Sequence, residues 1–134
     1  MNRAVTLLVA ATIFVIPASG HACGACVEDK VAATYDHGVV KDANLRHQQV
    51  VFVAIDGAGS PRLRERIVSA ARNVTGIQPG SVRTSIEPAA FSFALDRSRE
   101  ASAVVAQLRA GVRDPRAQFS VIRIVRDGVL TEPH

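Results

Sequence analysis

Long apolar runs, aromatic residues and cysteines are all scarce in this chain of 134 residues. There is no tryptophan, there are one tyrosine and two cysteines, and aromatic residues make up 4% of the sequence. The most apolar stretch runs from Ala4 to Ile16, which is shorter than the roughly 20 residues that a membrane-spanning helix needs. We therefore expect no stable membrane insertion of the finished protein.

The scarcity of aromatic residues also argues against nucleic acid as a partner, because single-stranded bases are commonly held by aromatic stacking. The formal net charge is +4, from 16 Lys and Arg against 12 Asp and Glu. Basic groups such as Arg62, Arg64 and Arg66 have acidic residues among them. That mixture is typical of a solvated, mildly basic surface, so we expect no nucleic-acid binding.

The first 22 residues have the pattern of a cleaved export signal. Arg3 gives a positive start, the apolar stretch follows, and Pro17 ends it before a group of small residues. Cleavage after Gly20 and cleavage after Ala22 both fit these small residues. We therefore expect a periplasmic or secreted protein, and only a short stretch separates either cut from the first cysteine.

With 48% hydrophobic residues, the chain can form one domain with a substantial core and is too short for two. Its composition divides it into four parts. They are a signal peptide (1–22), a Cys-x-x-Cys segment with an N-terminal helix (23–47), a periodic domain (48–128) and a C-terminal tail (129–134).

The first half of the periodic domain has the pattern of a strand followed by a helix. Residues 50–56 are apolar and rich in β-branched side chains, which predicts a buried strand. Ser60 and Pro61 are a favourable cap and first residue for a helix. An apolar stripe at three- and four-residue spacing follows: Leu63, Ile67, Ala70, Ala71 and Val74.

The second half has two alternating runs, a helix and a last strand. Residues 82–86 and 91–95 alternate in polarity around a turn at Pro88, which predicts an antiparallel hairpin. The next helix has apolar positions from Ala101 to Val112 and ends at Asp114-Pro115. Residues 119–125 are β-branched and predict the last strand, closed by Asp127-Gly128.

The order strand, helix, strand, strand, helix, strand predicts an α+β, ferredoxin-like βαββαβ fold preceded by an N-terminal helix. We expect a four-stranded antiparallel sheet with both domain helices on one face. The other face would stay open, where a periplasmic protein partner could dock. This fold serves many functions and does not select one.

The stretch from Val50 to Val125 resembles the heavy-metal-associated domain, the small fold of copper chaperones and metal-transporter tails. The likeness lies in VVFVAIDGAGSPRLRERI, GIQPGSVRTSIEPAAFSFAL and SREASAVVAQLRAGV. The resemblance implies a soft-metal protein whose Cys-x-x-Cys follows the first strand. Here the matching loop, 56–60, has no cysteine, so the family's ligands do not carry over to it.

Cys23 and Cys26 have the same spacing but lie ahead of the first strand. Val27, Val31, Tyr35 and Val39 recur every four residues and predict a helix that begins at Cys26. Backbone N–H groups at a helix start stabilise a thiolate, which is both a nucleophile and a metal ligand. Two thiolates can hold Cu(I), and we expect metal binding by Cys23 and Cys26 for copper buffering or handover.

Two other roles for this cysteine pair stay open. A pair this close readily forms a local disulfide in an oxidising compartment, and Cys-Gly-x-Cys is also the spacing of thiol-disulfide oxidoreductases. The histidines add little to the metal hypothesis. His21 survives only the earlier cut, His37 lies about 16 Å from Cys26 along a helix, and His47 and His134 lie at the ends of elements. We expect no catalytic residue.

Overall fold

The computed structural model describes residues 26–133; residues 1–25 and 134, which include the predicted signal peptide, Cys23 and His21, lie outside the described part. In chain order the elements are α1 (Val27–Thr34), α2 (His37–Leu45), β1 (Gln48–Asp56), α3 (Pro61–Ala71), β2 (Arg83–Ser85), β3 (Ala90–Asp96), α4 (Ala101–Val112), β4 (Gln118–Arg126) and β5 (Val129–Thr131). No helix in the described part is long and apolar enough to span a membrane.

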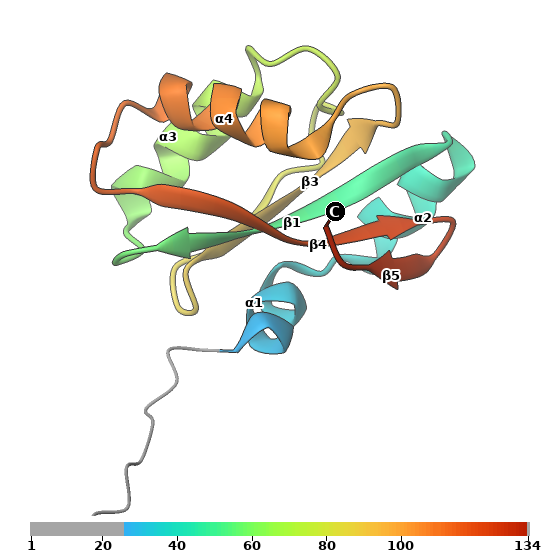
Figure 1. The fold of residues 1–134 in the computed structure, drawn as a ribbon, viewed down its shortest axis with the longest axis horizontal. Coiled ribbons are helices and arrows are strands. Elements are labelled where there is room, and N and C mark those ends of the chain that lie inside the picture. The colour runs from blue at the N-terminus through green and yellow to red at the C-terminus, as the bar shows by residue number, and fades with distance from the viewer. Residues whose placement is uncertain (1–25, 134) are drawn as a thin grey trace, which may run out of the picture.

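The predicted α+β class and antiparallel sheet are confirmed, but the described sheet has five strands, not four. The strand order is β2-β3-β1-β4-β5, with β1 in the centre between β3 and β4 (Figure 1). The additional strand β5 lies in the segment 129–134 that was predicted to be a tail. Asp127 and Gly128 both have positive φ, so they form a tight turn that folds β5 back onto β4.

Helices α3 and α4 pack together on one face of the sheet and form the larger core. The Ser60 hydroxyl accepts a hydrogen bond from the Leu63 N–H at 3.1 Å, and Pro61 is the first residue of α3, as predicted. Ile67 from α3 and Leu108 from α4 are buried against the alternate side chains of β1 and β3. The stripes found in the sequence therefore face the sheet.

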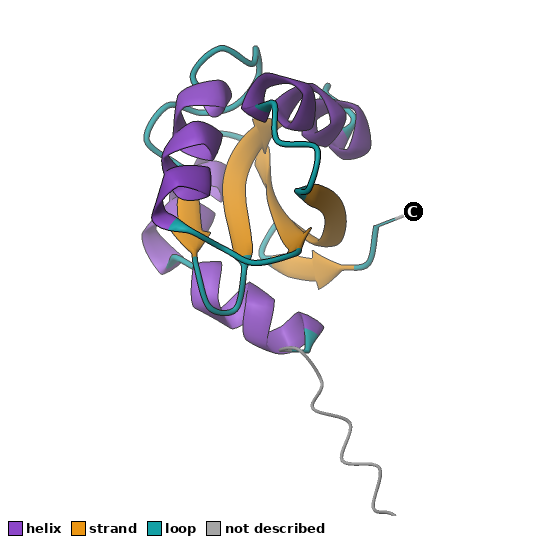
Figure 2. Ribbon diagram, turned by 90° about the vertical axis from the view of Figure 1, so that its left-hand side faces the viewer, coloured by secondary structure: helices purple, strands orange, loops and turns teal. Residues whose placement is uncertain are grey.

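The second face of the sheet is covered by α1 and α2, so the predicted open face is closed (Figure 2). The sequence predicted one helix here, but the chain breaks between Thr34 and His37. Asp36 causes the break because its carboxylate caps α2, accepting the Val39 N–H at 3.1 Å. The smaller core on this face contains Phe52 of β1 with Val31, Val39, Val40, Ala43, Val50, Ala94 and Val125.

Candidate functional site

Cys26 stands at the N-terminal cap of α1, as the sequence predicted, and its side chain is exposed. Its thiol donates a hydrogen bond to the Asp29 carboxylate, with Sγ 3.2 Å from Oδ2. Its carbonyl accepts the Lys30 N–H at 3.1 Å and so begins the helix. Cys23 lies outside the described residues, so the structure brings only one of the two predicted ligands into view.

The first turn of α1 is attached to the sheet by an ion pair with β4. Arg123 Nη2 lies 3.2 Å from Oε1 of Glu28 and 3.5 Å from Oε1 of Glu132. The guanidinium is largely covered, whereas both carboxylates are exposed. Arg123 thereby holds the start of α1 and the residue after β5 on the same side of β4, and this fixes the position from which Cys26 projects.

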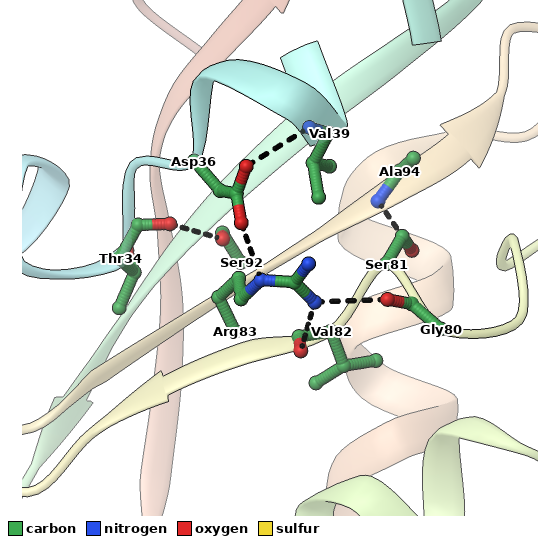
Figure 3. A network of polar contacts seen from close by, with 9 residues as sticks. All are labelled: Thr34, Asp36, Val39, Gly80, Ser81, Val82, Arg83, Ser92 and Ala94. Carbon is green, nitrogen blue, oxygen red and sulfur yellow. Dashed lines mark hydrogen bonds and ion pairs between the residues drawn. The ribbon is translucent and has the colours of Figure 1, made fainter. Parts of the chain in front are cut away.

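The other end of α1 is held by a buried hydrogen bond. The Ser92 hydroxyl, on β3, donates to the Thr34 carbonyl at 2.7 Å, and Ser92 is 1% exposed. The Thr34 hydroxyl in turn donates to the Lys30 carbonyl one turn earlier. Figure 3 shows Ser92 directed at this last residue of α1. The helix that carries Cys26 is thus fixed to the sheet at both ends.

The linker between α1 and α2 is fixed to the edge strand β2. Arg83 Nε donates to Asp36 Oδ2 at 2.7 Å, and its Nη1 donates to the carbonyls of Gly80 and Val82 (Figure 3). The hydrogen bond from Arg83, followed by that from the Val39 N–H, lowers the pKa of Asp36 below its ordinary value of 3.8. The Asp36 carboxylate therefore remains ionised and stabilises this corner of the molecule.

The histidines do not gather around Cys26. His37 is the first residue of α2 and His47 follows that helix with positive φ; both side chains are exposed. Within residues 26–133, no three His, Cys, Asp or Glu side chains are close enough to hold a metal ion. Among residues 26–133, the carboxylate beside the Cys26 thiol is that of Asp29, and Cys23 lies outside this range.

The loop after β1, where the heavy-metal-associated family carries its cysteines, is tightly packed. A shallow hollow of about 270 Å³ borders it, lined by Asp56, Asp114 and Arg116 among others. A Cβ atom at Gly59 would stand too close to the Ile86 carbonyl for normal contact, so the loop lies against the turn before β3. Its hydroxyl, on Ser60, is used as a helix cap, and the loop provides no soft ligand.

The hydroxyls of Ser60, Ser81 and Ser92 form hydrogen bonds with the backbone. Ser60 caps α3, Ser92 holds Thr34, and the Ser81 hydroxyl donates to the Gln78 carbonyl at 2.7 Å while accepting the Ala94 N–H at 3.0 Å. Each hydroxyl is therefore occupied by a structural hydrogen bond, in keeping with the sequence, which offers none of them a base.

Sequence reasoning missed one buried polar contact, between β1 and β4. Gln49 is 0% exposed; its amide Nε2 donates to the Arg99 carbonyl at 3.0 Å, and its Oε1 accepts Arg126 Nε at 2.8 Å. In the sequence, the only sign of this contact is that Gln49 is a polar residue at the start of an otherwise apolar strand. The contact joins the sheet to the segment before α4 and has no evident chemical role.

Comparisons with known proteins give no relative for this chain: no family model, no curated protein and no solved structure matches it.

Proposed function

We propose that this chain is an exported protein that binds a soft metal ion, with Cys23 and Cys26 as the ligands and Cu(I) as the ion. The observation that carries the proposal is the exposed Cys26 thiol at the N-cap of a helix that is fixed to the sheet at both ends. A displayed thiol on a rigid helix is accessible to an incoming ion and to an acceptor protein.

The surroundings of Cys26 suit this chemistry. The Cys26 sulfur is exposed, and the side-chain contact that the structure gives it is the hydrogen bond to the exposed Asp29 carboxylate, which an incoming metal ion could displace. Cu(I) accepts as few as two sulfur ligands, whereas Zn²⁺ generally takes four ligands. A site of two cysteines, with no group of metal-ligating side chains gathered at Cys26 within residues 26–133, therefore favours Cu(I).

We further propose that the domain is ferredoxin-like, with β5 and the α1–α2 pair added to it. The order β2-β3-β1-β4 and the position of α3 and α4 on one face support this assignment. It keeps the likeness to the heavy-metal-associated domain while moving the cysteine pair from the loop after β1 to the start of α1.

Titration of the reduced mature protein with Cu(I) against a coloured chelator tests the proposal. We expect one Cu(I) per chain, and loss of uptake when Cys23 and Cys26 are both replaced by serine. The matched control is Ser69→Cys with the native pair removed, which has a thiol at an exposed helical position without a partner. Equal affinity of that control and the native protein would contradict the proposal.

The other roles of the pair give different results in the same samples. Reduction of insulin by the native protein, lost in the serine variant, would identify a thiol-disulfide oxidoreductase instead. Protein purified from its own compartment can be analysed by mass spectrometry without reduction. A permanent Cys23–Cys26 disulfide in that sample would show that the pair is a local crosslink and not a metal site. The mass of that sample also tests the export signal, because cleavage after Gly20 or Ala22 gives different N-termini.

A further inference from the structure

The first two-thirds of β4 has no strand on its outer side. β5 pairs with Ile124–Arg126, and β1 occupies the inner side from Gln118 to Val125, with a break in register at Ile122. Within the described residues, no strand pairs with the outer edge of residues 118–123 (Figure 1), although the Ile122 carbonyl accepts Arg123 Nη1 at 2.8 Å. Such an edge offers unpaired backbone N–H and C=O groups to another strand.

The helix beside this edge has an unusual solvent face. In α4 only Arg109 is charged among the exposed positions, which are Ser102, Ala103, Ala106, Gln107, Arg109, Ala110 and Gly111. The exposed positions of the neighbouring α3 include Arg62, Arg64 and Glu65. A surface helix normally carries charge on its outer face, so this small-residue face of α4 is suited to contact with protein.

The free edge and the α4 face border a single groove of about 700 Å³. Ala106 and Ala110 line its helix side together with Arg109 and Arg113, and the half-buried Phe119 and Val121 line its strand side. A strand added to β4 would therefore complete the sheet and cover the groove at the same time.

We propose that a second copy of this chain occupies this edge, with the two β4 strands paired antiparallel about a two-fold axis at Ser120. This register sets Phe119 opposite Val121 of the second copy, and both side chains lie on the α4 side of the sheet. The two α4 helices then face one another across the axis, where small side chains allow a close approach. The two five-stranded sheets become one continuous sheet.

The charges at the two ends of the free edge favour a second copy over an unrelated strand. Arg116 precedes the edge; its side chain is 91% exposed and lies 3.6 Å from the Asp114 carboxylate of its own chain. Glu132 follows β5 at the other end, beside Arg123, and its side chain is 80% exposed. Antiparallel pairing brings Arg116 of each copy to Glu132 of the other, so the two-fold axis creates two opposite-charge contacts.

Charge reversal tests this arrangement by sedimentation. We expect the native domain to dimerise, and we expect Arg116→Glu and Glu132→Arg, each alone, to raise the dimer dissociation constant about tenfold or more, because each creates two like-charge contacts. A mixture of the two variants should dimerise again, since one copy then supplies Glu at both ends and the other supplies Arg. Circular dichroism checks that each variant is folded.

A substitution on α4 provides an independent measurement. Ala106→Glu should abolish the dimer, whereas Ala33→Glu, the same change at an exposed position of α1, should leave it intact. A native protein that sediments as a monomer at its highest soluble concentration overturns the proposal. So does a dimer that survives Ala106→Glu, or a pair of charge variants that stays monomeric when mixed.

Discussion

Asp36 and Arg83 join the linker between the first two helices to the edge strand β2, with Nε 2.7 Å from Oδ2. The same carboxylate caps α2 through the Val39 N–H. The Asp36 side chain therefore separates α1 from α2, caps α2 and joins the linker between the two helices to the sheet. The position of the helix pair on the second sheet face depends on this contact.

This contact predicts an acid-sensitive contribution to stability. The pKa of Asp36 in the folded protein is lowered, first by Arg83 and then by the Val39 N–H, so the unfolded state binds the proton more readily. The contribution is present above the ordinary value of 3.8 and is lost as the pH falls through the lowered pKa. The difference in unfolding free energy between native protein and Asp36→Asn should therefore be larger at about pH 7 than at about pH 3.

Urea unfolding at several pH values measures this difference. Asp42→Asn, on the same helix, is the control because Asp42 is exposed and its side chain makes no hydrogen bond within the described residues. The difference in unfolding free energy between native protein and Asp42→Asn should not shrink at low pH. If the unfolding free energy of Asp36→Asn differs from that of the native protein by the same amount at every pH, the Asp36–Arg83 contact does not make the predicted contribution.

Ser92→Ala removes the only side-chain donor that the described structure gives to the Thr34 carbonyl. Because the site is buried, we expect a loss of about 1–3 kcal/mol in unfolding free energy. Ser69→Ala, at an exposed position of α3, should change it by less than about 0.5 kcal/mol. Chemical denaturation measures both, and equal effects would show that Ser92 does not hold α1 to the sheet.

Ile67→Asp tests the larger core. Ile67 is 1% exposed between α3 and the sheet, and an unpaired carboxylate there should unfold the domain or remove most of its stability. Arg64→Asp places the same residue on the exposed side of the same helix and should leave the domain folded. Thermal melting of the two variants separates these outcomes, and similar melting temperatures would refute the assigned helix face.

Phe52→Ala tests whether the helix pair is integral to the fold. The Phe52 ring is 0% exposed in the smaller core and stacks with Tyr35, with centroids 6.2 Å apart. Its removal should cost about 3–5 kcal/mol. Tyr35→Ala should cost clearly less because that ring is 46% exposed. If Phe52→Ala melts like the native protein, α1 and α2 contribute little to stability.

Sequence periodicity located the larger core well. Alternation in residues 91–95 and the stripe from Leu63 to Ala71 indicate which side chains face the larger core. The alternation does not show that Ser92 and Ala94, on the other face of β3, are buried as well. The start of α3 was also predictable, since a serine cap and a proline act locally. The start of α4 was not predicted: the Glu100 carboxylate caps it by accepting the Ser102 and Ala103 N–H groups.

The features that were missed depend on contacts distant in sequence. Asp36 could have been recognised as a helix cap, but the position of the linker depends on Arg83, 47 residues later. The central strand β1 is buried on both sides, and its continuous apolar run shows that a second layer exists without showing which segment forms it. The strand β5 is short and fully exposed, so it has no burial pattern to detect.

Arg123 and Glu28, the pair that holds the start of α1, are 95 residues apart. Helix α1 packs against β1, β3 and β4, all of which are synthesised after it. During synthesis, or during export from the N-terminus onward, Cys26 is therefore exposed before strand β4, which fixes its helix, has emerged. Because the Cys26 thiol is also exposed in the folded domain, it is accessible from the time it emerges until after the sheet has formed.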